Sequence, residues 1–250
     1  MFTKILFTLL LLTTAAFADK ITIFAASDLK AALDTIKEQF EKEHPNATIR
    51  MIYGSSGKGR VQIARGAPYD LYFSANMDYV QELYKKGKVV TKPKLYAVGR
   101  LAIWSKNKNF DAKKGFENFL APWVDKIAIA NPAHAPYGQK AKQALQSVGI
   151  YNKIKDKIVL GENISQTANY INMKAVDIGI IALSLVLAPE IAKSPYNSYY
   201  LIDAKLHKPL RQGYALTKYG AHSQLAKEFY DFFQTKESAA IMKKYGFVVN

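Results

Sequence analysis

Two serines lie at turns whose backbone could bind an anion. Ser27 follows the apolar run Ile21–Ala26 and precedes a helical pattern. Ser56 lies in the turn Gly54–Gly57, which follows a second apolar run, Ala47–Tyr53. The start of a helix has unpaired backbone N–H groups and a partial positive charge, so a small residue there lets an anion approach the backbone. Taken alone, each serine could equally be a helix cap.

Two later turns have the same form. Asn131–Gly138 and Gly161–Ser165 each follow a short strand pattern and precede a helical one, and four turns of one kind indicate one shared ligand. Hydroxyl and backbone N–H groups supply donors, which suits a fully ionised tetrahedral dianion, whereas a protonated phosphate also needs an acceptor. Asp28 could be that acceptor, although the helix dipole also explains a carboxylate at this position. These residue types do not separate sulfate from molybdate.

The spacing of serine and lysine also fits serine acyl transfer. Lys30 lies three residues after Ser27, and Lys58 lies three residues after Ser55. The Ser-Asp-Asn and Lys-Thr-Gly motifs of such enzymes are missing, so a secreted Ser-Lys hydrolase is only the enzyme alternative, and we predict no catalytic residue. The run Gly54–Gly59 lacks the residue gap of a phosphate loop, and the histidines lack metal spacing, so we predict no nucleotide or metal cofactor.

The elements that position these turns alternate between strand and helix patterns. After Ser27, apolar residues recur at spacings of four, three and four and predict one buried helix face: Leu29, Leu33, Ile36 and Phe40. This helix should end at His44, before a proline. We expect further strands over Ala47–Tyr53 and Asp70–Ser74 and further helices toward Arg65 and over Met77–Lys86. This alternation predicts a parallel sheet with helices on its faces.

The second half of the chain continues the alternation. We expect one strand over Leu95–Ser105, a loop over Lys106–Gly115 and a short helix over Phe116–Leu120. Further strands are predicted at Ile127–Ala130, Lys157–Leu160, the first half of Asp177–Leu187, Tyr199–Ile202 and Gln212–Lys218. Further helices are predicted at Gly138–Gly149, Ser165–Met173, His222–Phe233 and Ser238–Lys244. A two-lobed arrangement would place the chain crossings near Val98–Leu101 and Lys208–Gly213.

The first eighteen residues have the pattern of a cleavable signal peptide. Lys4 precedes the apolar stretch Ile5–Leu12, and the segment ends in Ala16-Phe17-Ala18. Cleavage before Asp19 leaves 34 basic and 20 acidic side chains, a net charge of about +14. Export argues against nucleic acid as the partner of this basic surface, and solubility alone explains most of the lysines. The chain has no cysteine, which excludes a disulfide framework and a lipid-modified cysteine and predicts a soluble protein.

The chain resembles the periplasmic molybdate-binding proteins of bacterial ABC importers over essentially all its mature length. The resemblance rests on five segments taken together: Ile21–Leu29, Gly54-Ser55-Ser56, Gly66-Ala67-Pro68-Tyr69-Asp70-Leu71, Asn131–Gly138 and Lys244-Tyr245-Gly246-Phe247. It implies an α/β fold of the class II periplasmic binding proteins. Such a fold has two lobes, each a mostly parallel sheet flanked by helices, with the ligand cleft between them. The lobes would be 19–99 plus 211–250 and 100–210.

The resemblance also implies the ligand-binding residues. Ser27 and Ser56 would each donate a hydroxyl and a backbone N–H to oxygen atoms of the metal oxyanion, without being metal ligands themselves. Tyr137 and Ile164 lie where the second lobe gives backbone N–H groups. Ala182 takes the position at which related proteins have a tyrosine whose hydroxyl also donates. Either water or the hydroxyl of Tyr137 could replace that donor, and the donor count stays open.

The function implied by this resemblance is binding, without catalysis. We expect a monomeric periplasmic protein that captures molybdate, and tungstate too, and delivers it to an inner-membrane ABC permease. The alternative within the same class is a receptor for sulfate or another tetrahedral oxyanion.

Overall fold

A computed structural model of the chain describes residues 19–249. The predicted signal peptide, 1–18, lies outside the described residues. None of the helices within the described range is both long enough and apolar enough to cross a membrane.

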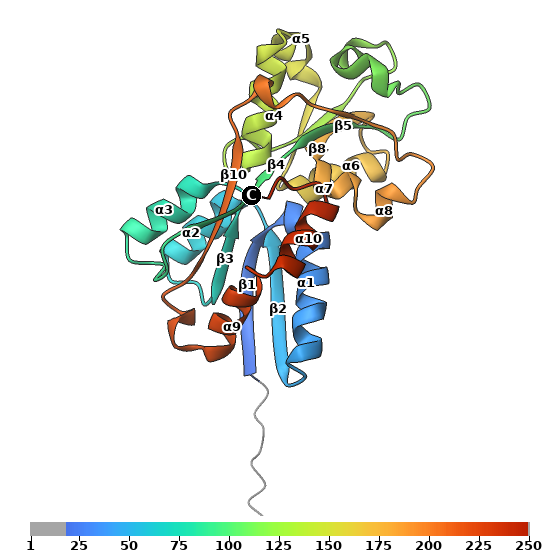
Figure 1. Cartoon of the computed structure of the whole chain (residues 1–250). Helices are drawn as coiled ribbons and strands as arrows, with labels where there is room; N and C mark the ends of the chain where they lie inside the picture. Colours follow the sequence, from blue (N-terminus) through green and yellow to red (C-terminus); the bar gives the residue numbers. More distant parts are fainter. Residues whose placement is uncertain (1–18, 250) are drawn as a thin grey trace, which may run out of the picture.

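The fold consists of two five-stranded sheets with helices packed on them (Figure 1). The first sheet has the order β2 (Ala47–Gly54), β1 (Asp19–Ala26), β3 (Leu71–Ser74), β10 (Leu210–Leu216) and β4 (Lys94–Gly99). The second has the order β7 (Ile158–Gly161), β6 (Ile127–Ala130), β8 (Ile178–Ala182), β5 (Leu101–Trp104) and β9 (Tyr199–Leu201). Each sheet is mixed, because β1 and β6 pair with both neighbours in parallel whereas β10 and β5 pair in antiparallel fashion. The predicted pair of α/β sheets is confirmed, as two mixed sheets in each of which two of the four strand pairings are parallel.

Helices cover both faces of the first sheet, and we call this assembly the first lobe. One face carries α1 (Lys30–Glu43), α9 (Gln224–Phe232) and α10 (Lys236–Lys244), and the other carries α2 (Ser56–Ala64) and α3 (Met77–Lys85). Successive residues of β1 point to opposite faces, so Ile23 packs with the first group and Phe24 with the second. The helix face predicted from Leu29 to Phe40 is fully buried, which confirms the periodicity.

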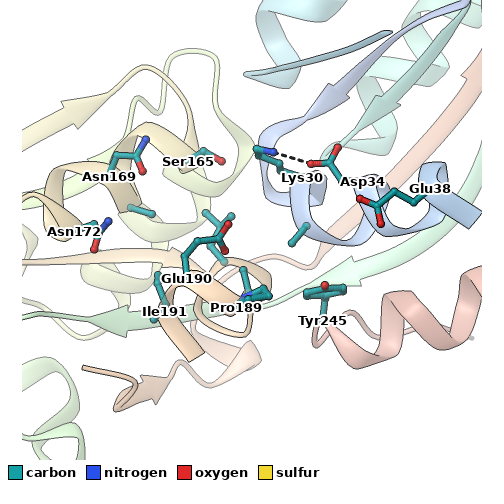
Figure 2. Close-up of a pocket in the computed structure, with 14 residues that line it drawn as sticks. Lys30, Asp34, Glu38, Ser165, Asn169, Asn172, Pro189, Glu190, Ile191 and Tyr245 are labelled. Carbon is teal, nitrogen blue, oxygen red and sulfur yellow. Dashed lines mark hydrogen bonds and ion pairs between the residues drawn. The ribbon is translucent and has the colours of Figure 1, made fainter. Parts of the chain in front are cut away.

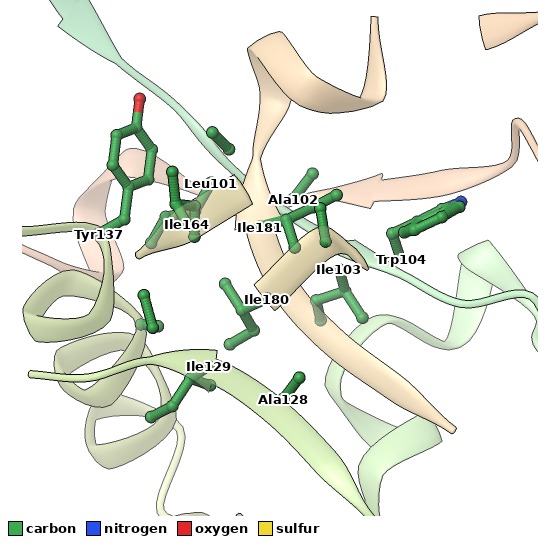
Figure 3. Close-up of a cluster of buried hydrophobic side chains, with 14 of the residues drawn as sticks. Leu101, Ala102, Ile103, Trp104, Ala128, Ile129, Tyr137, Ile164, Ile180 and Ile181 are labelled. Carbon is green, nitrogen blue, oxygen red and sulfur yellow. The ribbon is translucent and has the colours of Figure 1, made fainter. Parts of the chain in front are cut away.

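The second lobe is the second sheet with its own helices. They are α4 (Pro136–Ser147), α5 (Tyr151–Ile154), α6 (Ile164–Asn172), α7 (Leu183–Val186) and α8 (Pro189–Ala192). Their core contains Trp104, which is fully buried, together with the isoleucines of β6 and β8 (Figure 3). Short 3-10 turns complete the chain: η1 (Ser27–Leu29), η2 (Ala112–Leu120), η3 (Lys155–Lys157), η4 (Ala204–Leu206) and η5 (Gly220–His222).

The single strand expected over Leu95–Ser105 is wrong. The strand is interrupted at Arg100, so β4 belongs to the first sheet and β5 to the second. Both halves are apolar because both are buried, and periodicity therefore gives no sign of the break. Gly99 permits the crossing, because a Cβ atom there would lie 2.3 Å from the Tyr137 hydroxyl.

The loop expected over Lys106–Gly115 is also shorter than predicted, because η2 begins at Ala112. The side chain of Asp111 accepts a hydrogen bond from the backbone of Lys113, and Asn118 donates to the carbonyls of Asp111 and Gly115. Such side-chain to backbone bonds stabilise turns that carry no apolar periodicity.

Candidate functional site

Four helix starts converge on one small cavity between the two lobes. Ser27 is the first residue of η1, which runs into α1, and Ser56 is the first residue of α2. Tyr137 lies in the first turn of α4, and Ile164 begins α6. All four line a cavity of about 10 Å³ together with Ala26, Asp28, Gly54, Ser55, Ala75, Ala135 and Pro136. First-turn N–H groups have no partner within their own helix, so the cavity wall is rich in donors.

Neither serine caps the helix that it begins, since the capping positions belong to Ala26 and Ser55 and make no side-chain cap. The hydroxyl of Ser27 reaches across to the second lobe instead. It donates to Asn163 Oδ1 at 3.2 Å and accepts from the Ser165 N–H at 3.3 Å. The helix-cap alternative therefore does not describe Ser27 here.

The hydroxyl of Ser56 is held within the first lobe. It accepts a hydrogen bond from the backbone N–H of Ala75 at 2.9 Å, and the carbonyl of Ser56 accepts from the buried hydroxyl of Tyr72 at 2.6 Å. Because the Ala75 bond uses a lone pair of this oxygen, the hydroxyl proton is left free for a ligand.

The hydroxyl of Tyr137 points away from the apolar side chains around Ile164 (Figure 3). Its oxygen accepts from Gln212 Nε2 at 3.0 Å, and burial raises the pKa of this phenol well above its ordinary value. The hydroxyl of Tyr137 is therefore already engaged by Gln212, beside Asp28.

Ala182 is the last residue of β8 and pairs with Leu101 in the second sheet. It is fully buried in the core of the second lobe and is not among the residues that line the cavity.

A buried polar network behind the cavity was not visible in the sequence. Gln212 of β10 donates from Nε2 to Asp28 Oδ2 at 2.9 Å, and its Oε1 accepts from the hydroxyl of Tyr96 at 2.6 Å. Burial raises the pKa of Asp28 to about 6, although the bond from Gln212 and the nearby hydroxyl of Tyr137 oppose the rise. The residues of this network come from four separate elements, and only the fold brings them together.

A second group of contacts closes the two lobes on each other. The carbonyl of His134 accepts from the hydroxyl of Ser55 at 2.6 Å and from the N–H of Gly57 at 2.9 Å. The Nδ1 atom of His134 also lies 2.8 Å from the Ser55 hydroxyl. Lys58 of the first lobe forms an ion pair with Glu162 of the second. The spacing of the histidines gave no sign of this role for His134.

A substitution at Gly57 can test whether the contacts between the two lobes contribute to oxyanion binding. A Cβ atom there would lie 2.6 Å from the carbonyl oxygen and 3.0 Å from the Cα of His134. We therefore expect Gly57→Ala to hold the lobes apart, because the added methyl group would clash with His134 in the closed state. The ligand must then close the lobes against this clash, and oxyanion binding should weaken by about tenfold or more. Alanine also favours the helix by roughly 0.5–1 kcal/mol, so the free protein should not lose stability.

Calorimetry measures the affinity of Gly57→Ala, and small-angle scattering measures the separation of the lobes. Val61→Ala, at an exposed position of the same helix, is the matched control. Unchanged affinity in Gly57→Ala would show that the His134 contacts are incidental to binding.

A much larger cavity lies elsewhere in the described chain. A groove of about 440 Å³ runs between α1 and the helices α6 and α8, and Tyr245, which follows α10, borders it (Figure 2). Its charged side chains are Lys30, which pairs with Asp34 at 2.7 Å, and two glutamates, Glu38 and Glu190. This excess of carboxylates makes the groove a poor site for an anion.

Known proteins resemble this chain over most of its length. The family model described as bacterial extracellular solute-binding protein matches residues 21–248. The putative ABC transporter substrate-binding lipoprotein YvgL of Bacillus subtilis is 33% identical over 228 residues, which cover 91% of this chain and 85% of that protein. The molybdate-binding protein ModA of Rhodobacter capsulatus is 32% identical over 207 residues, or 82% and 79% of the two chains.

Among solved structures, the periplasmic molybdate-binding protein of Azotobacter vinelandii superimposes with a TM-score of 0.84 at 28% identity, covering 92% of this chain and 99% of that one. These matches confirm the predicted periplasmic-binding-protein fold and the prediction of a binding protein rather than an enzyme. The chain therefore belongs to the bacterial extracellular solute-binding proteins, as a member similar to the molybdate-binding proteins.

Proposed function

We propose that the protein captures molybdate outside the cytoplasm, accepts tungstate as a second ligand, and delivers the oxyanion to an inner-membrane ABC permease. The observation that carries the proposal is the convergence of four helix starts, two from each lobe, on one cavity. Neutral hydroxyl and N–H donors suit a fully ionised tetrahedral oxyanion. The protein would act as a monomer, exported through a cleaved signal peptide at 1–18, and would bind no nucleic acid.

The proposed donors are the hydroxyl and backbone N–H groups of Ser27 and Ser56 and the backbone N–H groups of Tyr137 and Ile164. They are supported by their place in the cavity wall. Ala182 would contribute no donor, since its side chain is a methyl group. The proposed division into 19–99 plus 211–250 and 100–210 is supported by the strands, because β4 and β10 lie in one sheet and β5 to β9 in the other.

Titration of the purified mature protein tests the ligand. At a hundred times Kd, a ligand that binds only the folded state stabilises it by about 2.7 kcal/mol, and for a protein of this size that raises the unfolding temperature by roughly 5–10 °C. We expect this upshift with molybdate and with tungstate, and a smaller one with sulfate at the same concentration. An upshift with sulfate and none with molybdate would instead favour the sulfate receptor.

A further inference from the structure

Asp28 is a buried carboxyl group in the wall of the cavity. Its side chain is 1% exposed and lies next to Ser27. Oδ2 accepts the hydrogen bond from Gln212, whereas Oδ1 has no hydrogen-bond partner within residues 19–249. Buried polar atoms are nearly always paired, so an unpaired oxygen on a residue that lines the cavity needs an explanation.

The surroundings of Asp28 determine which of its oxygens can carry a proton. The amide of Gln212 is oriented by Tyr96, whose hydroxyl donates to Oε1, so Nε2 must face Asp28. Oδ2 is therefore an acceptor, and Oδ1 is left to carry a proton when the carboxyl is neutral.

Within the described chain only neutral groups face Asp28, and the bond from Gln212 and the nearby hydroxyl of Tyr137 offset a negative charge only in part. The titratable ones are the phenols of Tyr137 on α4 and Tyr96 on β4, and burial raises the pKa of both well above their ordinary value, so they are neutral. From α7, the hydroxyl of Ser184 donates to the backbone carbonyl of Asp28 and not to its carboxyl. From β10 comes only the neutral amide of Gln212.

An ionised Asp28 and a fully ionised oxyanion are chemically incompatible neighbours. Both offer acceptors only, and like charges repel each other strongly at a buried position such as that of Asp28. A neutral carboxyl with its proton on Oδ1 is instead one more donor on a residue that lines the cavity.

We propose that Asp28 is a specificity-determining residue of this site, which binds a fully ionised oxyanion with its carboxyl protonated and donates a hydrogen bond to it from Oδ1. The inference rests on the proposed function. Burial, opposed in part by the bond from Gln212 and the Tyr137 hydroxyl, raises the pKa of Asp28 to about 6, and a bound dianion raises it further.

The proton balance gives a measurable signature. Above the pKa of the ligand-free protein, each bound oxyanion takes one proton from solvent onto Asp28. Affinity for molybdate should therefore fall by about tenfold between pH 7.5 and 8.5, a range in which the ligand itself stays fully ionised. A ligand with its own hydroxyl, such as hydrogen phosphate, could donate to an ionised Asp28 and should lose no affinity over the same range.

Asp28→Asn keeps a hydrogen-bond donor at this position but removes the titratable proton. An asparagine amide places an N–H donor where Oδ1–H would lie and keeps an oxygen for Gln212, but it does not titrate. We expect this variant to bind molybdate with nearly the same affinity at both pH values, and more tightly than the unaltered protein at pH 8.5. Asp156→Asn, at an exposed carboxyl in η3, should keep the tenfold fall.

Titration calorimetry at pH 8 in two buffers with different ionisation enthalpies counts the protons directly. The expected uptake is close to one proton for each molybdate with the unaltered protein and with Asp156→Asn, and close to zero with Asp28→Asn. Binding that is independent of pH in the unaltered protein, or a slope that Asp28→Asn retains, would overturn the inference while leaving the proposed function intact. Absence of molybdate binding at every pH would overturn the proposed function itself.

Discussion

Replacing Ser27 or Ser56 by alanine is expected to weaken molybdate binding by about ten- to a hundredfold in each case. A hydrogen bond to a charged group contributes roughly 1.5–3 kcal/mol, and every 1.4 kcal/mol is about tenfold in Kd. Ser27→Ala removes in addition the contacts that its hydroxyl makes with Asn163 and Ser165 of the second lobe, so its effect should be the larger of the two.

Calorimetry on the two variants measures this loss, and Ser147→Ala is the matched control. Like the two serines, Ser147 forms a hydrogen bond through its hydroxyl, which it donates to the carbonyl of Leu206, but it is not among the residues that line the cavity. Unchanged affinity in Ser27→Ala with the fold intact would mean that this hydroxyl only joins the lobes. Unchanged affinity in Ser56→Ala would mean that its bond to Ala75 is purely structural.

The second large effect is expected at Gly138, in the first turn of α4. A Cβ atom there would lie 1.9 Å from the carbonyl oxygen of Ala130, at the end of β6. Neither atom can move without shifting a strand or a helix, so Gly138→Ala should destabilise the protein by about 3 kcal/mol. It should also displace the N–H of Tyr137 and so weaken oxyanion binding.

Thermal unfolding and calorimetry on Gly138→Ala are compared with Gly149→Ala, which lies just beyond the other end of α4. Gly149 has a φ of 74° and no neighbouring atom within 4 Å of a Cβ, so alanine there costs only about 1 kcal/mol of backbone strain. Equal losses in the two variants would show that the contact between α4 and β6 relaxes easily.

The helix starts that form the site were largely predictable, because local chemistry decides them. Small residues after an apolar run mark Ser27 and Ser56, and the structure begins η1 and α2 at these residues. The start of α6 was predicted one residue late, at Ser165, since the side chain of Asn163 caps this helix.

The rest of the site depends on contacts between distant parts of the chain. No local pattern joins Asp28 to Gln212, which lie in different segments and meet only because β10 inserts between β3 and β4. His134 likewise carries no motif, and its role comes from the approach of the two lobes at Gly57. The interruption at Arg100 was not predicted, because the residues on both sides of it are buried and apolar. Their pattern does not reveal that the chain passes from one sheet to the other there.

The insertion of β10 between β3 and β4 also sets an order of folding. Tyr214 of β10 pairs with Phe73 of β3, so the first sheet cannot be completed until almost the whole chain has been delivered across the membrane. The second sheet takes all its strands from residues 101–201 and can form earlier. Distant pairings form slowly, because a long loop must close before they contribute. We therefore expect the first lobe, although it contains the first strand, β1, to be the last to fold.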